Sequence, residues 1–167
     1  MYSIRTAGPD DAPRIAVLGA HVWVHTYAAA GVSDVIAQYV LASFTPDKMR
    51  ALVEDPAVVL LIAEAEATLA AYLVMRLGSY HAEVSNEIET LYVQDSFAGQ
   101  GIGSALLAHA RDIAMTRAGN RSVWLMVNSQ NSKAISFYHR LGMTQDGVTY
   151  FELSGAKHEN KVMVARD

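Results

Sequence analysis

One segment, residues 88–107, constrains the fold more than any other part of this 167-residue sequence. Residues 88–93 alternate with the period of two that is typical of a strand, and from Ile102 onward apolar residues recur at helical spacing. Three glycines lie at alternate positions between the two parts, namely Gly99, Gly101 and Gly103. The first N–H groups of a helix lack internal partners, so a strand, a glycine loop and a helix in this order predict a phosphate-binding turn in an α/β protein.

The spacing of the glycines excludes two common nucleotide motifs. A dinucleotide-binding turn needs G-x-G-x-x-G and an acidic residue about 20 positions later, where this chain has Gly119 and Asn120. A P-loop needs a lysine after its last glycine, and none follows here. Two interpretations stay open: a pyrophosphate cradle made of backbone N–H groups, and a turn that only packs a helix tightly on a sheet.

The flanking sequence predicts a mixed α/β (α+β) fold in a single domain, residues 1–167. Expected strands are residues 3–6, 58–63, 68–77, 88–93, 122–127, 148–153 and 161–165. Expected helices begin near residues 11, 34, 46, 102 and 131, with Asp10 or Asp11 and Ser33 as N-caps. Residues 78–85 and 154–160 are expected to be loops. Early hairpins followed by βα units fit neither a full Rossmann sheet nor a sandwich.

Composition narrows the class of function. The chain is 51% hydrophobic and 18% charged, which predicts a folded protein, and its net charge of −4 does not indicate binding to nucleic acid or to a membrane. It has no cysteines and no apolar stretch near the ~18 residues of a membrane span, so a soluble cytoplasmic protein is expected. His21 and His25 are the only histidines four positions apart, no carboxylate completes a zinc motif, and no metal is expected.

Two motifs resemble those of the GNAT superfamily of N-acetyltransferases. Motif A is matched by Leu91-Tyr92-Val93, Phe97-Ala98-Gly99-Gln100-Gly101-Ile102-Gly103 and Ala105-Leu106-Leu107, and motif B by residues 128–143. Both motifs occur in the family's order, separated by one helix and one strand, and the resemblance covers nearly the whole chain. It implies a mostly antiparallel sheet of about seven strands, with helices on both faces and a V-shaped opening between residues 91–93 and 122–127.

The resemblance implies acetyl-CoA as cosubstrate. The backbone of Leu91, Tyr92 and Val93 would pair with the pantetheine arm, as an added strand does. Backbone N–H groups would hold the pyrophosphate, from Ala98, Gly99, Gln100, Gly101, Ile102, Gly103 and Ser104. Ala98 takes the first place of the family's Arg/Gln-x-x-Gly-x-Gly/Ala signature, so a side-chain contact to phosphate is lost there. Asn131 matches the asparagine that caps the next helix and approaches the cofactor.

The resemblance also implies direct acetyl transfer to a primary amine. Tyr138 matches the tyrosine that protonates the departing CoA thiolate, although an aromatic residue on a helix also fits plain core packing. An alkylamine has a pKa near 10, so a general base is expected. Glu87 takes the place of the base in the histone-acetylating branch, and Glu89 lies closer to the thioester and is a second candidate. Both glutamates also fit a solvated strand end.

The acceptor is expected to be an amine held by Trp23, Tyr27 and Glu89. Residues 149–161 and residues 23–27 look like the bacterial polyamine-acetylating branch of PaiA-like enzymes, and the acidic residues Glu83, Glu87 and Glu89 suit a polycation such as spermidine. Two alternatives stay open: a protein N-terminal or lysine acetyltransferase, and a non-catalytic acyl-CoA sensor. A homodimer is compatible with the resemblance.

Overall fold

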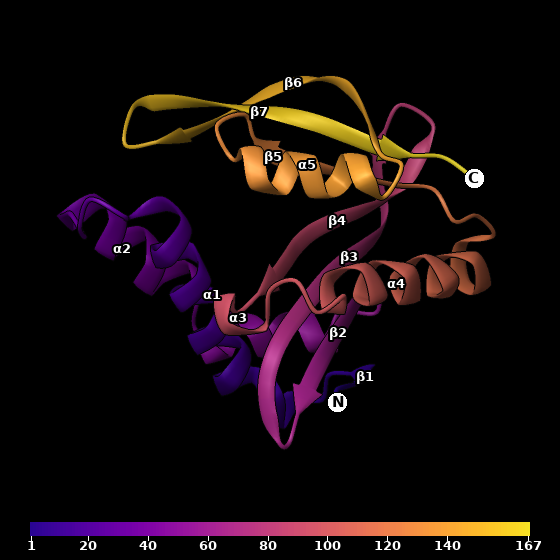
Figure 1. Ribbon diagram of the computed structural model, residues 1–167, viewed down its shortest axis with the longest axis horizontal. Coiled ribbons are helices and arrows are strands. Elements are labelled where there is room, and N and C mark those ends of the chain that lie inside the picture. Colours follow the sequence, from indigo (N-terminus) through magenta and orange to yellow (C-terminus); the bar gives the residue numbers. More distant parts are fainter. The chain divides into compact units, whose positions relative to one another are not determined.

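The computed structural model describes residues 1–167 and contains seven strands and five α-helices (Figure 1). The strands are β1 (Ser3–Thr6), β2 (Val58–Ala65), β3 (Thr68–His81), β4 (Val84–Val93), β5 (Val123–Asn128), β6 (Thr144–Leu153) and β7 (Ala156–Ala165). The helices are α1 (Ala12–Tyr27), α2 (Asp34–Ser43), α3 (Pro46–Glu54), α4 (Ile102–Ala118) and α5 (Ser132–Arg140), with short 3-10 helices η1 (Pro9–Asp11) and η2 (Asp95–Phe97).

All seven strands belong to one sheet, in the order β1-β2-β3-β4-β5-β7-β6. β4 and β5 run parallel, whereas β1 with β2, β5 with β7 and β6 with β7 run antiparallel. The expected mixed and mostly antiparallel sheet is therefore confirmed. The parallel pair is short: one residue pair, Glu87 with Trp124, joins β4 to β5.

The chain forms two compact units. Unit 1 holds residues 1–75 and 90–110, and unit 2 holds residues 76–89 and 111–167. β3, β4 and α4 each begin in one unit and end in the other. Each unit buries its own apolar cluster.

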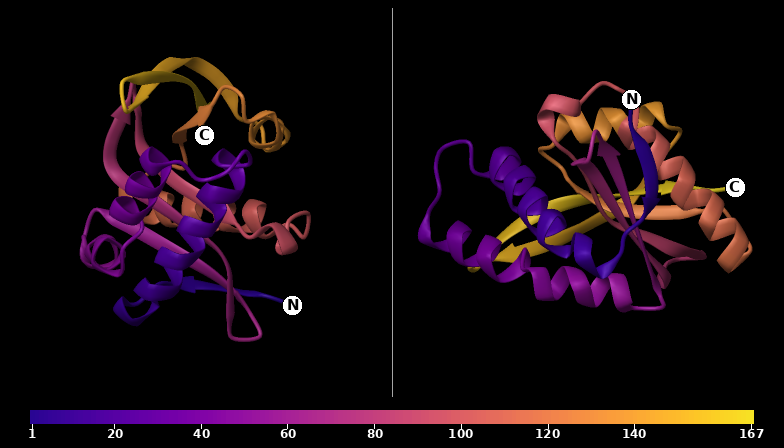
Figure 2. Two further views of the ribbon diagram at one scale, coloured as in Figure 1. Left: turned by 90° about the vertical axis from the view of Figure 1, so that its left-hand side faces the viewer. Right: turned by 90° about the horizontal axis from the view of Figure 1, so that it is seen from below.

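In unit 1 the helices α1, α2 and α3, drawn in indigo to purple, follow one another before β2 (Figure 2). Ile15 of α1, Leu60 of β2 and Tyr72 of β3 are buried together in its core. Gly19 lets α1 pack closely, because a Cβ at this position would lie 2.6 Å from the Phe44 ring. In unit 2 a smaller buried cluster contains Val84, Trp124, Val162 and Val164.

Helix starts follow the expected caps at two of three positions. Ser33 Oγ accepts a hydrogen bond from the N–H of Ile36, and Asn131 Oδ1 accepts one from the N–H of Ala134. Asp11 precedes α1, but its side chain does not cap that helix. Its carboxylate instead accepts hydrogen bonds from the Gly8 N–H and from two arginines.

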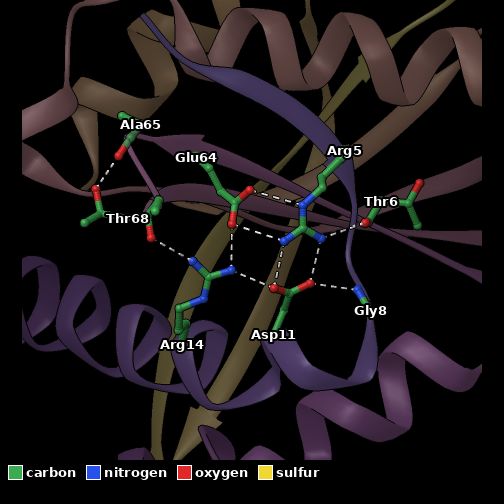
Figure 3. A network of polar contacts seen from close by, with 9 residues as sticks. Arg5, Thr6, Gly8, Asp11, Arg14, Glu64, Ala65 and Thr68 are labelled. Carbon is green, nitrogen blue, oxygen red and sulfur yellow. Dashed lines mark hydrogen bonds and ion pairs between the residues drawn. The ribbon is translucent and has the colours of Figure 1, made fainter.

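Those arginines belong to a four-residue ion-pair network in unit 1 (Figure 3). Arg5 of β1 donates to both oxygens of Asp11, at 2.8 and 2.9 Å, and Arg14 of α1 donates to Asp11 Oδ1 at 2.6 Å. Both arginines also reach Glu64 of β2, Arg5 at 3.1 Å and Arg14 at 2.7 Å. Hydrogen bonding from Arg5 holds the pKa of the Asp11 carboxyl far below its usual range.

The predictions of two loops are wrong, because strands occupy most of the residues in both segments. β3 continues to His81 and β4 begins at Val84, so the loop expected over residues 78–85 is a hairpin with a two-residue turn. Gly78 lies inside β3 with φ +76°, a value typical of a β-bulge. Residues 154–160 likewise reduce to a turn at Ser154 and Gly155, because β7 already begins at Ala156. β6 and β7 form a long hairpin, orange to yellow in Figure 1.

Candidate functional site

The glycine loop, residues 98–101, lies between η2 and α4 in unit 1 and is exposed. Gly99 and Gly101 adopt φ of +77° and +81°, and a Cβ at either position would meet nothing within 4 Å. Left-handed residues at alternate positions turn successive N–H groups toward one side, and such a nest binds anions. The loop geometry therefore fits a phosphate held by backbone alone.

Backbone hydrogen bonds define which donors remain for a ligand. The Ala98 N–H donates to the Asp95 carbonyl at 3.0 Å, so it is already engaged. The Ala105 N–H donates to the Gly101 carbonyl at 3.0 Å, and the N–H groups of residues 102–104 precede this first bond of α4. The donors available to a pyrophosphate thus run from Gly99 to Ser104, one residue shorter than the expected set.

The end of β4, residues 91–93, is half-buried in unit 1. The Tyr92 ring lies edge-on to Tyr72, with ring centroids 5.6 Å apart, and 6.3 Å from Phe44. Because this side chain packs into the unit's own core, Tyr92 offers a ligand its backbone rather than its phenol. That agrees with the expected role of Leu91, Tyr92 and Val93, which needs a strand edge and no particular side chain.

The two candidate bases in unit 2 have different partners. Ser79 Oγ donates to Glu87 Oε2 at 2.7 Å, whereas Glu89 Oε1 forms an ion pair with Arg76 Nε. Glu83, the third residue of the expected acidic group, pairs with Arg166 at 2.6 Å. Hydrogen bonding from Arg166 lowers the pKa of Glu83, which makes this carboxylate a weaker proton acceptor. The Glu89 carboxylate is engaged by Arg76, whereas that of Glu87 is engaged by a hydroxyl.

A tryptophan that the sequence pattern did not single out lies next to this pair. Trp124 Nε1 donates to the Ser79 carbonyl at 2.8 Å, and the His81 ring lies 5.6 Å from the Trp124 ring. His81 Nε2 is in turn 2.9 Å from Asp146 Oδ2. Ser79 and His81 lie in the segment expected to be a loop, so no strand register was available to predict these contacts.

In unit 2, Asn131 caps α5 and Tyr138 lies on that helix, as expected from motif B. Tyr138 is buried, with 8% of its surface exposed, and its ring centroid is 5.2 Å from that of Phe137. The loop before α5 is attached to β7, because Ser129 Oγ donates to Glu159 Oε1 at 2.7 Å. Asn131 therefore starts a helix whose N-terminal loop is held in place.

Trp23 and Tyr27, the expected acceptor-site aromatics, belong to a three-ring stack in unit 1. Trp23 lies between Tyr27 and Tyr39, with centroid distances of 5.1 and 4.8 Å. Trp23 is 8% exposed and Tyr27 is 41% exposed. Only Tyr27 of the two expected residues thus presents much surface to a ligand. Tyr39 of α2 is the third ring of the group, and helical spacing within α1 gives no signal for it.

The predicted site residues divide between the units. Glu87, Glu89, Asn131 and Tyr138 lie in unit 2, whereas residues 91–93, the glycine loop and the two acceptor aromatics lie in unit 1. No three His, Cys, Asp or Glu side chains are grouped to hold a metal ion. None of the helices has both the length and the apolar character to cross a membrane.

Comparison with known proteins identifies the family. Residues 29–143 match the acetyltransferase (GNAT) family. The uncharacterized N-acetyltransferase Rv2669 of Mycobacterium tuberculosis is 29% identical over 161 residues, which cover 94% of this chain and 97% of that protein. A streptothricin acetyltransferase of Streptomyces lavendulae is 30% identical over 97 residues, covering 58% of this chain and 50% of that protein.

A solved structure shows the same fold. The PaiA N-acetyltransferase of Thermoplasma acidophilum, crystallised with coenzyme A, has a TM-score of 0.77 at 20% identity, and the alignment covers 100% of this chain and 99% of that one. The family match spans more than half of the sequence, and the strand order and the strand–glycine loop–helix turn agree with it. This chain belongs to the acetyltransferase (GNAT) family and is an acetyl-CoA-dependent N-acetyltransferase.

Proposed function

We propose that the enzyme acetylates a primary amine of a small polyamine such as spermidine by direct attack on the thioester of acetyl-CoA. The observation that carries this mechanism is the environment of Glu87. Of the three neighbouring glutamates, Glu87 is the one bound by a hydroxyl rather than by an arginine. It is therefore the carboxylate best suited to accept a proton from the attacking amine.

Most of the residues that we assign to cosubstrate binding lie in unit 1 of the chain, and the remaining one, Asn131, lies in unit 2. The pyrophosphate is bound by the N–H groups of Gly99, Gln100, Gly101, Ile102, Gly103 and Ser104, and the pantetheine arm by the backbone of residues 91–93. The open surface at Gly99 and Gly101 supports this assignment, because no side chain lies within 4 Å of where a Cβ would stand.

The chemical step moves two protons. The amine nitrogen forms a bond to the acetyl carbonyl carbon, and the carbon–sulfur bond breaks. Glu87 accepts the proton that the nitrogen loses, and Tyr138 donates a proton to the departing thiolate. The low exposure of Tyr138, 8%, supports this role, because a closely packed side chain has few orientations open to it.

The polyamine assignment rests on two weaker observations. Residues 149–161 and 23–27 resemble PaiA-like enzymes in sequence, and Tyr27 of the aromatic stack is exposed at 41%, where it can contact a cation through its ring face. The structure leaves fewer of the three glutamates to attract a polycation than the sequence indicated. Glu83 and Glu89 are already paired with Arg166 and Arg76, so Glu87 carries most of the attraction for a polycation.

A panel of acceptors tests the proposal. The protein is mixed with acetyl-CoA and one of three acceptors, and thiol release is followed: spermidine, a peptide with a free N-terminus but no lysine, and a blocked peptide with one lysine. We expect kcat/KM to be highest for spermidine. A higher value for either peptide would replace the polyamine by a protein acceptor. Tight CoA binding without turnover of any amine would instead identify an acyl-CoA sensor, the alternative that the missing Arg or Gln at Ala98 raises.

A further inference from the structure

Ser79 of β3 contacts the proposed base directly. Its hydroxyl donates to Glu87 Oε2 at 2.7 Å, and both residues are half-buried in unit 2. A donor at this distance fixes one carboxylate oxygen and so limits rotation of the glutamate side chain.

The backbone of Ser79 is fixed by a third strand. Trp124 of β5 lies opposite Glu87 in the single β4–β5 residue pair, and its indole N–H reaches the Ser79 carbonyl at 2.8 Å. Trp124 is 8% exposed and packs in the buried cluster of unit 2. The Ser79 carbonyl is thus held by a buried indole.

Other charged and titratable groups around this pair are engaged elsewhere. On β3, Arg76 pairs with Glu89, and His81 pairs with Asp146 at 2.9 Å. Arg166, which follows β7, pairs with Glu83 at 2.6 Å and lies 3.6 Å from Asp146. These pairings leave the Ser79 hydroxyl as the side-chain group seen to bind Glu87.

We propose that Ser79 is a positioning residue for acetyl transfer: its hydroxyl orients the Glu87 carboxylate, and Trp124 holds Ser79 in place. The inference rests on the proposed role of Glu87 as general base and goes beyond it by naming the group that orients the base. A base held in one orientation meets the proton of the bound amine without a prior rotation, which raises kcat and leaves cosubstrate binding unchanged.

The test combines a conservative rescue with a matched control. Ser79→Ala is expected to lower kcat about tenfold, the effect of one hydrogen bond to a charged group, with an unchanged KM for acetyl-CoA. Ser79→Thr keeps the hydroxyl and should restore kcat. Ser85→Ala removes a hydroxyl from β4, two residues before Glu87, and should change neither kcat nor the KM for acetyl-CoA.

A double-mutant cycle separates this inference from the proposed base. If Ser79 acts through Glu87, then Ser79→Ala lowers kcat no further in a Glu87→Gln background. Full activity of Glu87→Gln would remove the base assignment and with it the role of Ser79. A large loss in Glu87→Gln together with wild-type kinetics in Ser79→Ala, or with losses that multiply in the double mutant, would overturn the positioning role alone. Equal thermal midpoints among the variants establish that folding is intact.

Discussion

Tyr138 has 8% of its surface exposed, so only a small part of the residue can meet a substrate. Its phenol is the proposed acid, and Tyr138→Phe removes the hydroxyl while keeping the ring that packs beside Phe137. We expect kcat to fall about 100-fold, at the lower end of what a general acid contributes. The Kd for CoA should stay unchanged, because the ring remains. Steady-state kinetics and calorimetric titration with CoA measure the two quantities.

Tyr80 of β3 provides a matched control for this change. It is 68% exposed, and Tyr80→Phe removes the same hydroxyl from a position with no proposed role. Its kcat should equal that of the wild type. If Tyr138→Phe also kept the wild-type kcat, another group or solvent would have to protonate the thiolate.

At the residue scale, the sequence predicted the candidate bases better than it predicted the residues that contact them. The sequence left both Glu87 and Glu89 open as candidate bases, and the structure gives them different partners, Ser79 and Arg76. These partners lie 8 and 13 positions away on the neighbouring strand. Which residues face each other depends on the register of two strands, and period-two patterning within one strand does not reveal that register.

At the scale of elements, the prediction that the chain binds acetyl-CoA can be tested at the turn between β4 and α4. Gly101 has φ +81°, and an L-residue in that region costs about 1 kcal/mol. Because a Cβ there meets nothing, Gly101→Ala should act only by shifting the backbone away from the left-handed conformation. We expect the KM for acetyl-CoA to rise several-fold with little change in kcat, measured at saturating amine.

Gly119, at the end of α4, separates a general backbone effect from a local one. It has φ +78° and the same open surroundings, so Gly119→Ala imposes a similar strain away from the glycine loop. Its thermal midpoint should fall by a similar amount to that of Gly101→Ala, while its KM for acetyl-CoA stays at the wild-type value. Equal rises in KM for both variants would show that the loop has no special part in binding.

Elements marked by residues close in sequence were predicted well, whereas strand segments that depend on pairing with an adjacent strand were not. The strand–glycine loop–helix turn and the caps at Ser33 and Asn131 depend on residues close in sequence, and all were found. The β3–β4 turn and the start of β7 were missed, because polar residues at the solvated ends of hairpins resemble loops. Pairing with an adjacent strand keeps these segments extended, and a single-sequence pattern does not contain that information.

At the scale of the whole molecule, stability depends on contacts that join distant segments. The network of Arg5, Asp11, Arg14 and Glu64 joins β1, η1, α1 and β2, although these residues span 59 positions of sequence. The sequence pattern had indicated only a helix cap at Asp11. Asp11 is buried, at 7% exposed, and removing its charge leaves the two arginines with one of their two shared carboxylates, that of Glu64.

Asp11→Asn should therefore lower the free energy of unfolding by about 2 kcal/mol at pH 7, a value below that of a fully buried pair because the arginine side chains are 44% and 37% exposed. Asp10→Asn changes charge equally at the neighbouring exposed position and should cost much less. Urea unfolding monitored by tryptophan fluorescence measures both. Equal losses in the two variants would show that net charge, and not the network, sets the difference.

The pH dependence of the same variant has a defined sign. The pKa of Asp11 is lowered in the folded state by hydrogen bonding from Arg5, and that of Glu64 is also lowered by Arg5, so the unfolded chain binds more protons in acid. The stability that Asp11 contributes is fully present above the unfolded pKa of about 4 and is lost progressively as pH falls below it. The gap between the wild type and Asp11→Asn should thus be constant from pH 8 to about pH 5 and should shrink from about pH 4 downward. A gap that stayed constant to about pH 3, or grew there, would mean that Asp11 is not the group whose ionisation stabilises the fold.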